Sequence, residues 1–322
     1  MVDGFINFNL NEKTPTIIKV IGVGGGGGNA VEYMYEKGIC DVDFVICNTD
    51  YQALRNSPIP CKIQLGKELT AGHGAGNNPA MGEKSAQESL ADIEAILKKD
   101  TRMAFITAAM GGGTGTGAAP VIAKLSKDMG ILTVGIVSVP ARFEGPKRLD
   151  QARDGLRRLK DHVDCLIVID NEKIKSIYGS QTISQAFAKA NDVLNIAAKG
   201  IAEIITLPGY INVDFADVRT VMTDSGVAIM GAAQASGEDR AIRAITEALE
   251  SPLLNNNDIL GAKDILLNIT SGTDEITMDE MSQITSHIIR KVGNNAAVIW
   301  GVGTDPDLGD AVSVTSIATG FP

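Results

Sequence analysis

Cysteine is scarce in this sequence of 322 residues, and the four cysteines form no Cys-x-x-Cys pair (Cys40, Cys47, Cys61 and Cys165). Without paired spacing the sequence predicts neither a disulfide framework nor a thiolate zinc site, so reduced thiols are the simplest interpretation. The three histidines are also far apart, and none has a partner at metal-ligand spacing. We therefore expect no metal site built from protein side chains alone.

Long apolar runs are absent as well. No stretch reaches the roughly 20 residues that a membrane-spanning helix needs. The segment Met1–Thr16 has no basic start followed by an apolar run, which is the pattern of a secretory leader. These absences predict a cytoplasmic protein with no direct insertion into a membrane.

Basic residues are outnumbered by acidic ones. The chain has 29 Lys and Arg against 39 Asp and Glu, a formal charge of 29 − 39 = −10. Nucleic acid is not an expected partner, because phosphate contacts need clustered cations. Apolar residues make up 44% of the chain, which excludes wholesale disorder, and the length suggests about two domains.

Two common catalytic motifs are also missing. There is no Gly-x-x-x-x-Gly-Lys-Ser/Thr phosphate loop and no Gly-x-Ser-x-Gly nucleophile turn. Glycine itself is abundant, with 35 residues, and 11 of them fall in two short clusters at 22–28 and 111–117. This uneven placement is the first indication of function.

Both glycine clusters follow a predicted strand and precede a predicted helix. Apolar, β-branched runs are typical of strands buried on both faces. Their alternation with helical stretches predicts an α/β fold with a doubly wound, mainly parallel sheet. The predicted strands are 16–23, 42–47, 103–109, 131–139 and 165–169, and the predicted helices are 29–37, 118–129 and 148–162.

A long central helix is predicted next, because apolar residues recur every three or four positions from Ser184 to Leu207. Pro208 and Gly209 end it. The alternation then resumes and predicts a second, smaller α/β domain, with strands at 227–232, 265–270, 297–302 and 312–318 and helices at 238–249 and 278–292. We expect a first domain at 1–183, a connecting helix at 184–209 and a C-terminal domain at 210–322.

Glycine loops between a buried strand and a helix can bind anions through backbone N–H groups and the helix N-terminus. The first loop matches Gly-x-Gly-x-x-Gly at Gly22, Gly24 and Gly27, which alone fits a tight turn equally well. Because the second loop would lie at the same carboxyl edge of the sheet, the pair predicts a polyphosphate site. Neither loop has a lysine, so amides and the Thr114 and Thr116 hydroxyls would bind, with Mg²⁺ neutralising charge.

The second loop, GGGTGTG, is very similar to the signature loop of the tubulin superfamily. With VIGVGGGGGNAV before it and NVDFADVRTVM after it, the chain closely resembles the FtsZ family of tubulin-like bacterial division proteins, from about Ile17 to Gly320. The resemblance implies a tubulin-like GTP-binding first domain that takes GTP or GDP with Mg²⁺ on the phosphates. It also implies a GTPase that assembles head to tail into filaments of the division ring at midcell.

The resemblance further implies individual nucleotide-binding residues. The glycine loops would hold phosphates, the AGHGAG loop at 71–76 would face the γ-phosphate, and the FEGPKR segment would meet the ribose. Asn171 and the long helix would line the base pocket. The residues implied are Gly25, Gly26, Gly27, Gly28, Asn29, Ala71, Gly72, Gly113, Thr114, Gly115, Glu144, Arg148, Asn171, Phe187, Asn191 and Asp192.

The chemistry of these residues agrees with a guanine site. An Asp carboxylate accepts hydrogen bonds from guanine N1–H and N2–H₂, donors that adenine lacks there, so Asp192 could select guanine. Phe187 and Asn191 are i,i+4 neighbours on one helix face. Other interpretations stay open: Phe187 as core, Asn191 and Asp192 as a solvated break in the helix, and Glu144 with Arg148 as a surface ion pair of small worth.

An acidic pair follows the long helix. Asp214 and Asp217 are three residues apart, and the spacing alone fits an N-cap with an acid in the first turn. The resemblance implies instead that Asn212, Asp214 and Asp217 enter the GTP site of the next subunit and help to polarise the attacking water. Acids that arrive only on assembly would not repel the γ-phosphate in the free subunit, and phosphoryl transfer needs mainly positioning and charge neutralisation. Head-to-tail contact is heterologous and builds open filaments.

Three features depart from the family pattern. Ala141 stands where relatives usually carry an aromatic residue, and His73 replaces a usually aliphatic one. The chain stops at Pro322, whereas full-length relatives continue with a linker and a short peptide. Division proteins and membrane tethers are expected as partners through such a tail.

Two other functions fit parts of the sequence. Asp50 lies about 20 residues after the first glycine loop, as in an NAD-dependent dehydrogenase, but the second loop has no place in that interpretation. A non-catalytic filament that only holds nucleotide is the other alternative, and Asp214 and Asp217 argue against it. Phosphate release during GTP-driven assembly would separate these functions.

Overall fold

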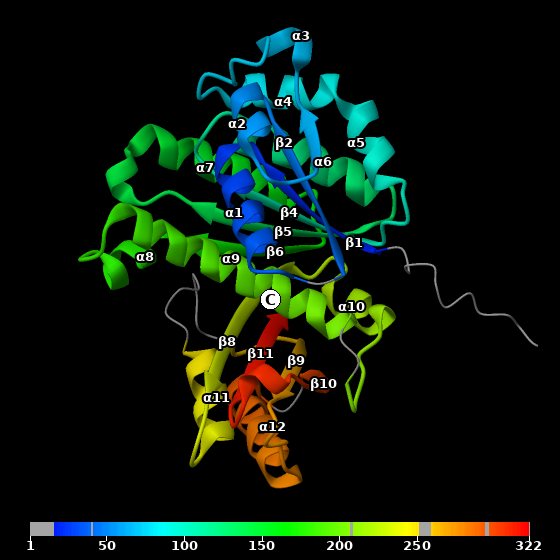
Figure 1. Ribbon diagram of the computed structural model, residues 1–322, viewed down its shortest axis with the longest axis vertical. Coiled ribbons are helices and arrows are strands. Elements are labelled where there is room, and N and C mark those ends of the chain that lie inside the picture. The colour runs from blue at the N-terminus through cyan, green and yellow to red at the C-terminus, as the bar shows by residue number, and fades with distance from the viewer. Residues whose placement is uncertain (1–15, 40, 207–208, 251–258, 294–295, 322) are drawn as a thin grey trace, which may run out of the picture.

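Two α/β units separated by one long helix form the molecule (Figure 1). The computed structural model describes residues 16–39, 41–206, 209–250, 259–293 and 296–321. Several expectations lie outside these residues: the N-terminal segment without a leader, Cys40, the helix end at 207–208 and the chain end at Pro322. In the described part of the chain, every helix is too short or too polar to cross a bilayer.

The larger unit contains a seven-stranded sheet in the order β3-β2-β1-β4-β5-β6-β7, and every neighbouring pair is parallel. Every residue of the central strand β1 is buried, as its β-branched apolar run predicts. The predicted parallel α/β sheet is confirmed. Its strands are β1 (Ile18–Val23), β2 (Val42–Asn48), β3 (Cys61–Gln64), β4 (Met103–Ala109), β5 (Leu132–Val139), β6 (Cys165–Asp170) and β7 (Gly226–Val227).

Helices cover both faces of this sheet. One core cluster joins alternate strand residues to α1 and α9, and a second joins the intervening residues to α5, α6 and α7, which is the doubly wound arrangement. The helices are α1 (Gly24–Glu36), α2 (Tyr51–Asn56), α3 (Lys67–Thr70), α4 (Pro79–Glu88), α5 (Leu90–Leu97), α6 (Thr114–Asp128), η1 (Arg142–Glu144), α7 (Pro146–Lys160), α8 (Asn171–Tyr178) and α9 (Ile183–Thr206).

The structure differs from the sequence-based elements in two ways. Helices α1 and α6 begin inside the glycine clusters, at Gly24 and Thr114, and not after them. Glycine is a poor helix former, so tertiary packing of the loops decides these helix starts. The stretch 51–100 contains α2, β3, α3, α4 and α5, none of which has a pattern long enough to be predicted.

The smaller unit has a mixed sheet in the order β10-β9-β11-β8, in which β9 and β10 are parallel and β11 is antiparallel to both of its neighbours. Helices α11 and α12 pack on one face, while Leu266 and Ile317 on the other face join the core around α9. Its elements are α10 (Phe215–Met222), β8 (Ile229–Ala235), α11 (Arg240–Leu249), β9 (Asp264–Ser271), α12 (Met278–Val292), β10 (Ala297–Thr304), η2 (Pro306–Leu308) and β11 (Val312–Thr319).

The range predicted as one strand, 227–232, belongs to two strands in different sheets. Gly226 and Val227 form β7, which pairs with β6 in the large sheet, whereas β8 begins at Ile229 in the small one. The backbone N–H of Ala228 donates to the carbonyl of Leu166 (2.9 Å). The chain therefore changes sheets within one apolar run, which hydrophobicity alone does not reveal.

Helix α9 sets the distance between the elements at its own two ends. It has 24 residues, so it is about 36 Å long. In Figure 1, α8 lies near the beginning of α9, and α10 lies past its end. Residues carried by the first turns of α9 and by the segment after it are therefore far apart within one chain.

Candidate functional site

A cavity of about 400 Å³ lies at the carboxyl edge of the large sheet. It opens where β1 and β4, neighbours at the reversal of strand order, lead into α1 and α6, the position where ligands bind in such sheets. Both glycine loops thus meet at one edge, as predicted. The lining consists of Val23, Gly25, Gly26, Asn29, Ala108, Ala109, Met110, Gly112, Gly113, Thr114, Gly115, Ser138, Pro140, Glu144, Arg148, Asn171, Phe187, Ala190, Asn191 and Leu194.

One set of glycines is required by packing between the loops. Gly24 has a φ of +73°, and a Cβ there would lie 2.8 Å from the backbone nitrogen of Gly115. A Cβ at Gly26 would lie 2.4 Å from the Cβ of Ala109, and one at Gly27 would lie 2.4 Å from the carbonyl oxygen of Thr107. These glycines let the first loop pack against the second loop and against β4, and Gly27 lies behind the cavity and not in its lining.

A second set of glycines borders open space. A Cβ at Gly25, Gly28 or Gly112 would meet no atom within 4 Å. Gly25 and Gly112 line the main cavity, and Gly28 lines an adjoining cavity of about 220 Å³. Packing does not require glycine at these positions, and the room beside their backbone N–H groups suits a phosphate chain.

The threonines of the second loop divide in the same way. The Oγ1 of Thr114 lies 2.6 Å from the Oγ1 of Thr49, at the N-terminus of α6. The Oγ1 of Thr116 is buried and accepts a hydrogen bond from the backbone N–H of Gly111 (2.8 Å). Thr114 borders the cavity as predicted, whereas Thr116 stabilises the loop itself.

The far end of the cavity is suited to a planar, polar ring. Among the described residues, the buried Oδ1 of Asn171 has no hydrogen-bond partner. Phe187 is 44% exposed and borders the cavity with Asn191, so Phe187 is not a core residue. An orphaned acceptor beside an exposed ring is what a base with ring N–H donors would satisfy.

Asp192 is not in the cavity lining. Its Oδ1 accepts a hydrogen bond from the hydroxyl of Tyr33 (3.0 Å), and its Oδ2 lies 3.9 Å from the Nζ of Lys189. Burial and the bond to Asp192 raise the pKa of Tyr33, so the hydroxyl stays protonated and donates at neutral pH. Tyr33 lies one turn after Asn29 on α1, a spacing that could have drawn attention to it in the sequence.

Glu144 and Arg148 form the predicted i,i+4 ion pair, with 3.1 Å between Oε2 and Nη1. Glu144 also accepts a hydrogen bond from the backbone N–H of Ala141 (3.0 Å), which fixes the turn before α7. Ala141 itself is fully buried. Both members of the pair line the cavity, so the ion pair is part of the candidate site.

The AGHGAG loop lies beside the cavity and not in it. Ala71 and Gly72 are outside the lining, and both have positive φ angles. A Cβ at Gly113 would lie 2.9 Å from the Cβ of Ala75, which places the following residues of this loop against the second glycine loop. The structure therefore brings this segment to the end of the cavity that the glycine loops form, but Ala71 does not line the cavity.

Asp50, the acid that suggested a dehydrogenase, has a local role. Its Oδ1 accepts hydrogen bonds from the backbone N–H groups of Gln52 (2.8 Å) and Ala53 (3.2 Å) and so caps α2. This is ordinary helix N-capping. The geometry gives no support to a ribose-binding acid at this position.

The acidic pair after the long helix forms a capping box. The backbone N–H of Asp217 donates to the Oδ1 of Asp214 (2.8 Å), and the backbone N–H of Asp214 lies 3.4 Å from the Oδ2 of Asp217. The Oδ1 of Asn212 accepts from the backbone N–H of Gly209 (2.7 Å). Asn212 and Asp214 are exposed, so capping leaves them accessible to another molecule.

This segment is fixed on the small sheet, and we call it the hydrolysis loop (residues 209–217) after the role that the family resemblance implies for it. Ile211 and Val302 exchange two backbone hydrogen bonds (3.0 and 3.3 Å). A Cβ at Gly209 would lie 2.3 Å from the carbonyl oxygen of Val302. The loop is thus attached to β10, at the end of α9 away from the cavity.

The acids and the nucleotide cavity are far apart in one chain. Phe187 borders the cavity in the first turns of α9, and Thr206 ends the helix before the hydrolysis loop. Thr206 is 19 positions after Phe187 (206 − 187 = 19), which corresponds to about 29 Å along the axis. Asp214 and Asp217 therefore do not reach the cavity of their own subunit.

In the part of the chain that the structure describes, no three His, Cys, Asp or Glu side chains come together as a metal site. Glu144 is the acid in the cavity lining, and it is paired with Arg148. A cation at this site would therefore take most of its ligands from phosphate oxygens and water, which suits Mg²⁺.

Comparison with known families decides between the remaining interpretations. Residues 17–179 match the Tubulin/FtsZ family, GTPase domain, and residues 226–322 match the FtsZ family, C-terminal domain. The chain belongs to the FtsZ family. Proteins of this family named cell division protein FtsZ include one from Porphyromonas gingivalis, 49% identical over 100% of this chain and 71% of its own length. Another, from Coxiella burnetii, is 48% identical over 98% of this chain and 82% of its own.

Solved structures agree with the FtsZ assignment. A structure described as an FtsZ dimer from M. jannaschii superposes with a TM-score of 0.88 at 43% identity, covering 95% of this chain and 89% of that one. CetZ1 from Haloferax volcanii shares 21% identity with a TM-score of 0.78 and covers 95% and 94% of the two chains, which supports the fold. The tubulin-like two-domain α/β fold predicted from the sequence is confirmed.

Proposed function

We propose that this chain is a polymerising GTPase of cell division, which assembles head to tail into filaments and hydrolyses GTP between successive subunits. The observation that carries the proposal is the separation of two half-sites. The glycine-lined cavity lies at one end of α9, and the exposed Asp214 and the half-buried Asp217 lie at the other. A site divided in this way is completed only when the end of one subunit meets the beginning of the next.

The cavity residues bind the nucleotide in this proposal. Backbone N–H groups at Gly25, Gly112 and Gly113, with the N-terminus of α6, hold the phosphates. The Thr114 hydroxyl adds a donor at the same place. Neither glycine loop carries a lysine, so Mg²⁺ bound to the phosphates would supply the charge neutralisation.

Guanine is selected at the other end of the cavity. The Oδ1 of Asn171, which has no partner within the chain, accepts a hydrogen bond from the base. Phe187 lies against a face of the base, and Asn191 lies at its edge. Asp192, oriented by Tyr33, accepts from the N1–H and N2–H₂ groups of guanine at the rim. Adenine lacks these donors, so the site distinguishes GTP from ATP by hydrogen bonds that ATP leaves unmade.

The hydrolysis loop acts on the GTP of its neighbour. The carboxylates of Asp214 and Asp217 accept hydrogen bonds from the attacking water and orient it. Asn212 assists as a neutral partner. Head-to-tail contact of this kind is heterologous and extends into an open filament. Turnover is then coupled to assembly, since free subunits hold GTP without the acids.

The same proposal includes location and partners. We place the protein in the cytoplasm at the midcell division ring, as its own assembly partner and as a partner of division proteins and membrane tethers. The working division of the chain is a GTP-binding domain at 1–183, a connecting helix at 184–209 and a C-terminal domain at 210–322 that begins with the hydrolysis loop.

Substitution of Asp214 tests the divided site. Asp214→Ala removes both the carboxylate and the helix cap, which is worth about 1 kcal/mol. Asp214→Asn keeps an N-cap of similar quality and removes only the charge, so it is the matched control for stability. We expect both variants to bind GTP as the parent does and to release phosphate at least about 100-fold more slowly. Parental turnover by purified Asp214→Asn would contradict the assignment, and GTP-driven light scattering without phosphate release by the parent would indicate a non-catalytic filament.

A further inference from the structure

Arg240 is the most completely bonded buried charge in the smaller domain. Its side chain is 6% exposed, and its five N–H groups make six hydrogen bonds, because Nη1 meets three acceptors with two hydrogens and shares one of them. Two go to the carboxylate of Glu280, from Nε (2.8 Å) and Nη2 (3.2 Å). The others go to the carbonyl and carboxylate of Asp274 and to the carbonyls of Glu275 and Asp310, at 2.7–3.0 Å. A planar guanidinium with five N–H donors suits such a set of acceptors, which a lysine does not.

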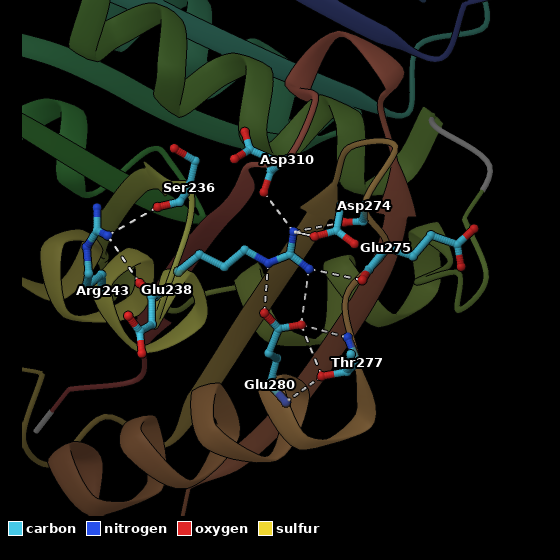
Figure 2. Close-up of polar contacts among 9 residues, drawn as sticks. Ser236, Glu238, Arg243, Asp274, Glu275, Thr277, Glu280 and Asp310 are labelled. Atoms are coloured by element: carbon cyan, nitrogen blue, oxygen red, sulfur yellow. Dashed lines mark hydrogen bonds and ion pairs between the residues drawn. The ribbon is translucent and has the colours of Figure 1, made fainter.

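These bonds fix one backbone turn, residues 272–277, between β9 and α12. Figure 2 shows Asp274 and Glu275 on one side of the guanidinium, Asp310 above it and Glu280 below it. Glu280 also accepts from the backbone N–H and hydroxyl of Thr277 and so closes a capping box at the start of α12. The position of Glu275 is therefore determined by a buried ion pair and not by packing of its own exposed side chain.

The turn reaches the hydrolysis loop through a single described hydrogen bond. The hydroxyl of Tyr210 donates to the Oε1 of Glu275 (2.8 Å). Both side chains border an apolar cavity of about 540 Å³ with Ile211, Met278 and Trp300. The space behind Tyr210 is not filled by protein, so close packing does not hold this side of the loop. The position of Tyr210 therefore depends more on its hydrogen bond to Glu275 than on packing.

We propose that Arg240 and Tyr210 are positioning residues for hydrolysis: Arg240 fixes Glu275, Glu275 holds the Tyr210 hydroxyl, and Tyr210 sets the place of Asn212 and Asp214 in the next subunit's site. Neither residue touches the nucleotide. The inference rests on the proposed function, because it assumes that the hydrolysis loop acts on the neighbouring GTP. Small displacements of such groups reduce turnover strongly while leaving ligand binding unchanged.

Exposed single-atom changes test the link without threatening the fold. Tyr210 is 68% exposed, so Tyr210→Phe removes the hydroxyl alone. We expect phosphate release per polymerised subunit at saturating GTP to fall about fivefold, the equivalent of one hydrogen bond, with the GTP affinity of the free subunit unchanged. Glu275→Ala should fall to the same level, and Glu275→Gln, which keeps an acceptor, should recover most of the loss. Tyr35→Phe on α1 is the matched control and should keep the parental rate.

A double-mutant cycle tests the part of Arg240. Glu280→Gln weakens the contacts of Arg240 while keeping an oxygen acceptor for the Thr277 cap. It should lower turnover in the parent and have no further effect in Tyr210→Phe, because both changes interrupt one chain of contacts. Equal effects in the two backgrounds would overturn the role of Arg240.

The outcomes also separate this inference from the proposed function. If Asp214→Asn loses turnover and Tyr210→Phe keeps the parental rate, the hydrolysis loop is active and the positioning role is wrong. If Asp214→Asn itself keeps the parental rate, the proposed function is wrong and the positioning role falls with it. A parallel loss of GTP affinity in Tyr210→Phe would likewise overturn a role confined to hydrolysis.

Discussion

The glycine-lined cavity and the contacts that hold the hydrolysis loop are formed by different kinds of chemical groups. The cavity is lined largely by backbone and small residues of two glycine loops, and the ion pair of Glu144 and Arg148 stands at its edge. The hydrolysis loop is held on one side by backbone bonds to Val302 and on the other by a side-chain network centred on Arg240.

The difference follows from what each half-site must do. A polyphosphate is bound by many backbone N–H groups that cannot be lost by substitution, provided that no side chain fills the space. In the proposed function, the hydrolysis loop instead presents two acids at a set position outside its own subunit. Side-chain hydrogen bonds achieve this, and they make that half-site the more sensitive one to single-atom changes and to pH.

The largest expected effect separates glycines that border the ligand from glycines that pack. Gly25→Leu places its side chain in open space, so the unliganded protein should melt as the parent does while its GTP affinity falls more than about 1,000-fold. Gly26→Leu, one residue on, collides with Ala109 and should lose about 1–3 kcal/mol of unfolding free energy.

Calorimetry and GTP titration of the two glycine variants decide the matter. If Gly25→Leu binds GTP normally, the open face of the first loop is not the phosphate site. If both variants melt alike, the distinction between packing glycines and ligand-bordering glycines fails.

A smaller effect is expected from the side-chain half. Glu280→Gln removes the one of the two carboxylates that pairs with both Nε and Nη2 of the buried Arg240, and it should cost about 2 kcal/mol of stability at pH 7. Hydrogen bonds from Arg240 hold the pKa of Glu280 below its ordinary value. Such a carboxylate stabilises the fold above its unfolded pKa, near 4.5, and the contribution is lost as pH falls through the lower, folded pKa. The difference in stability between parent and variant, measured by denaturation, should therefore shrink below about pH 4.5; a constant difference down to pH 3 would contradict the ion pair.

The smallest expected effect lies at the base end of the cavity. Tyr33→Phe removes the hydroxyl that orients Asp192, so GTP affinity should fall about threefold. Inosine triphosphate lacks the 2-amino group, and its affinity should fall less. Titration of both nucleotides checks this, with Tyr35→Phe as the control. An equal loss for the two would show that Asp192 does not read the 2-amino group.

The sequence was sufficient for the regular parts of the fold. Buried strands such as β1 and β4 and the long periodic helix α9 have strong patterns, and the two glycine loops could be placed at one sheet edge from strand order alone. The elements between residues 51 and 100 are short and depend on tertiary contacts, as α3 does with four residues. Hydrophobicity also gave no sign that the chain changes sheets at Ala228.

The candidate site was predicted unevenly for similar reasons. Residues in contiguous motifs, such as Gly25 and Thr114, lie on the cavity as expected. Contacts between distant residues could not be read from spacing: Tyr33 with Asp192, Tyr210 with Glu275, and Arg240 with three segments of the chain. Such pairs depend on the relative placement of whole elements, which a single sequence does not contain.

Mixing two inactive variants tests the divided site most directly. Asp214→Asn keeps the cavity and lacks the donated acid, whereas Gly25→Leu keeps the acid and lacks a usable cavity. Each alone should release little phosphate from GTP. Our account predicts that an equimolar mixture releases phosphate several times faster than the sum of the two, because an intact hydrolysis loop meets an intact cavity at the mixed contacts. A mixture no faster than that sum, with co-assembly confirmed by sedimentation, would contradict it.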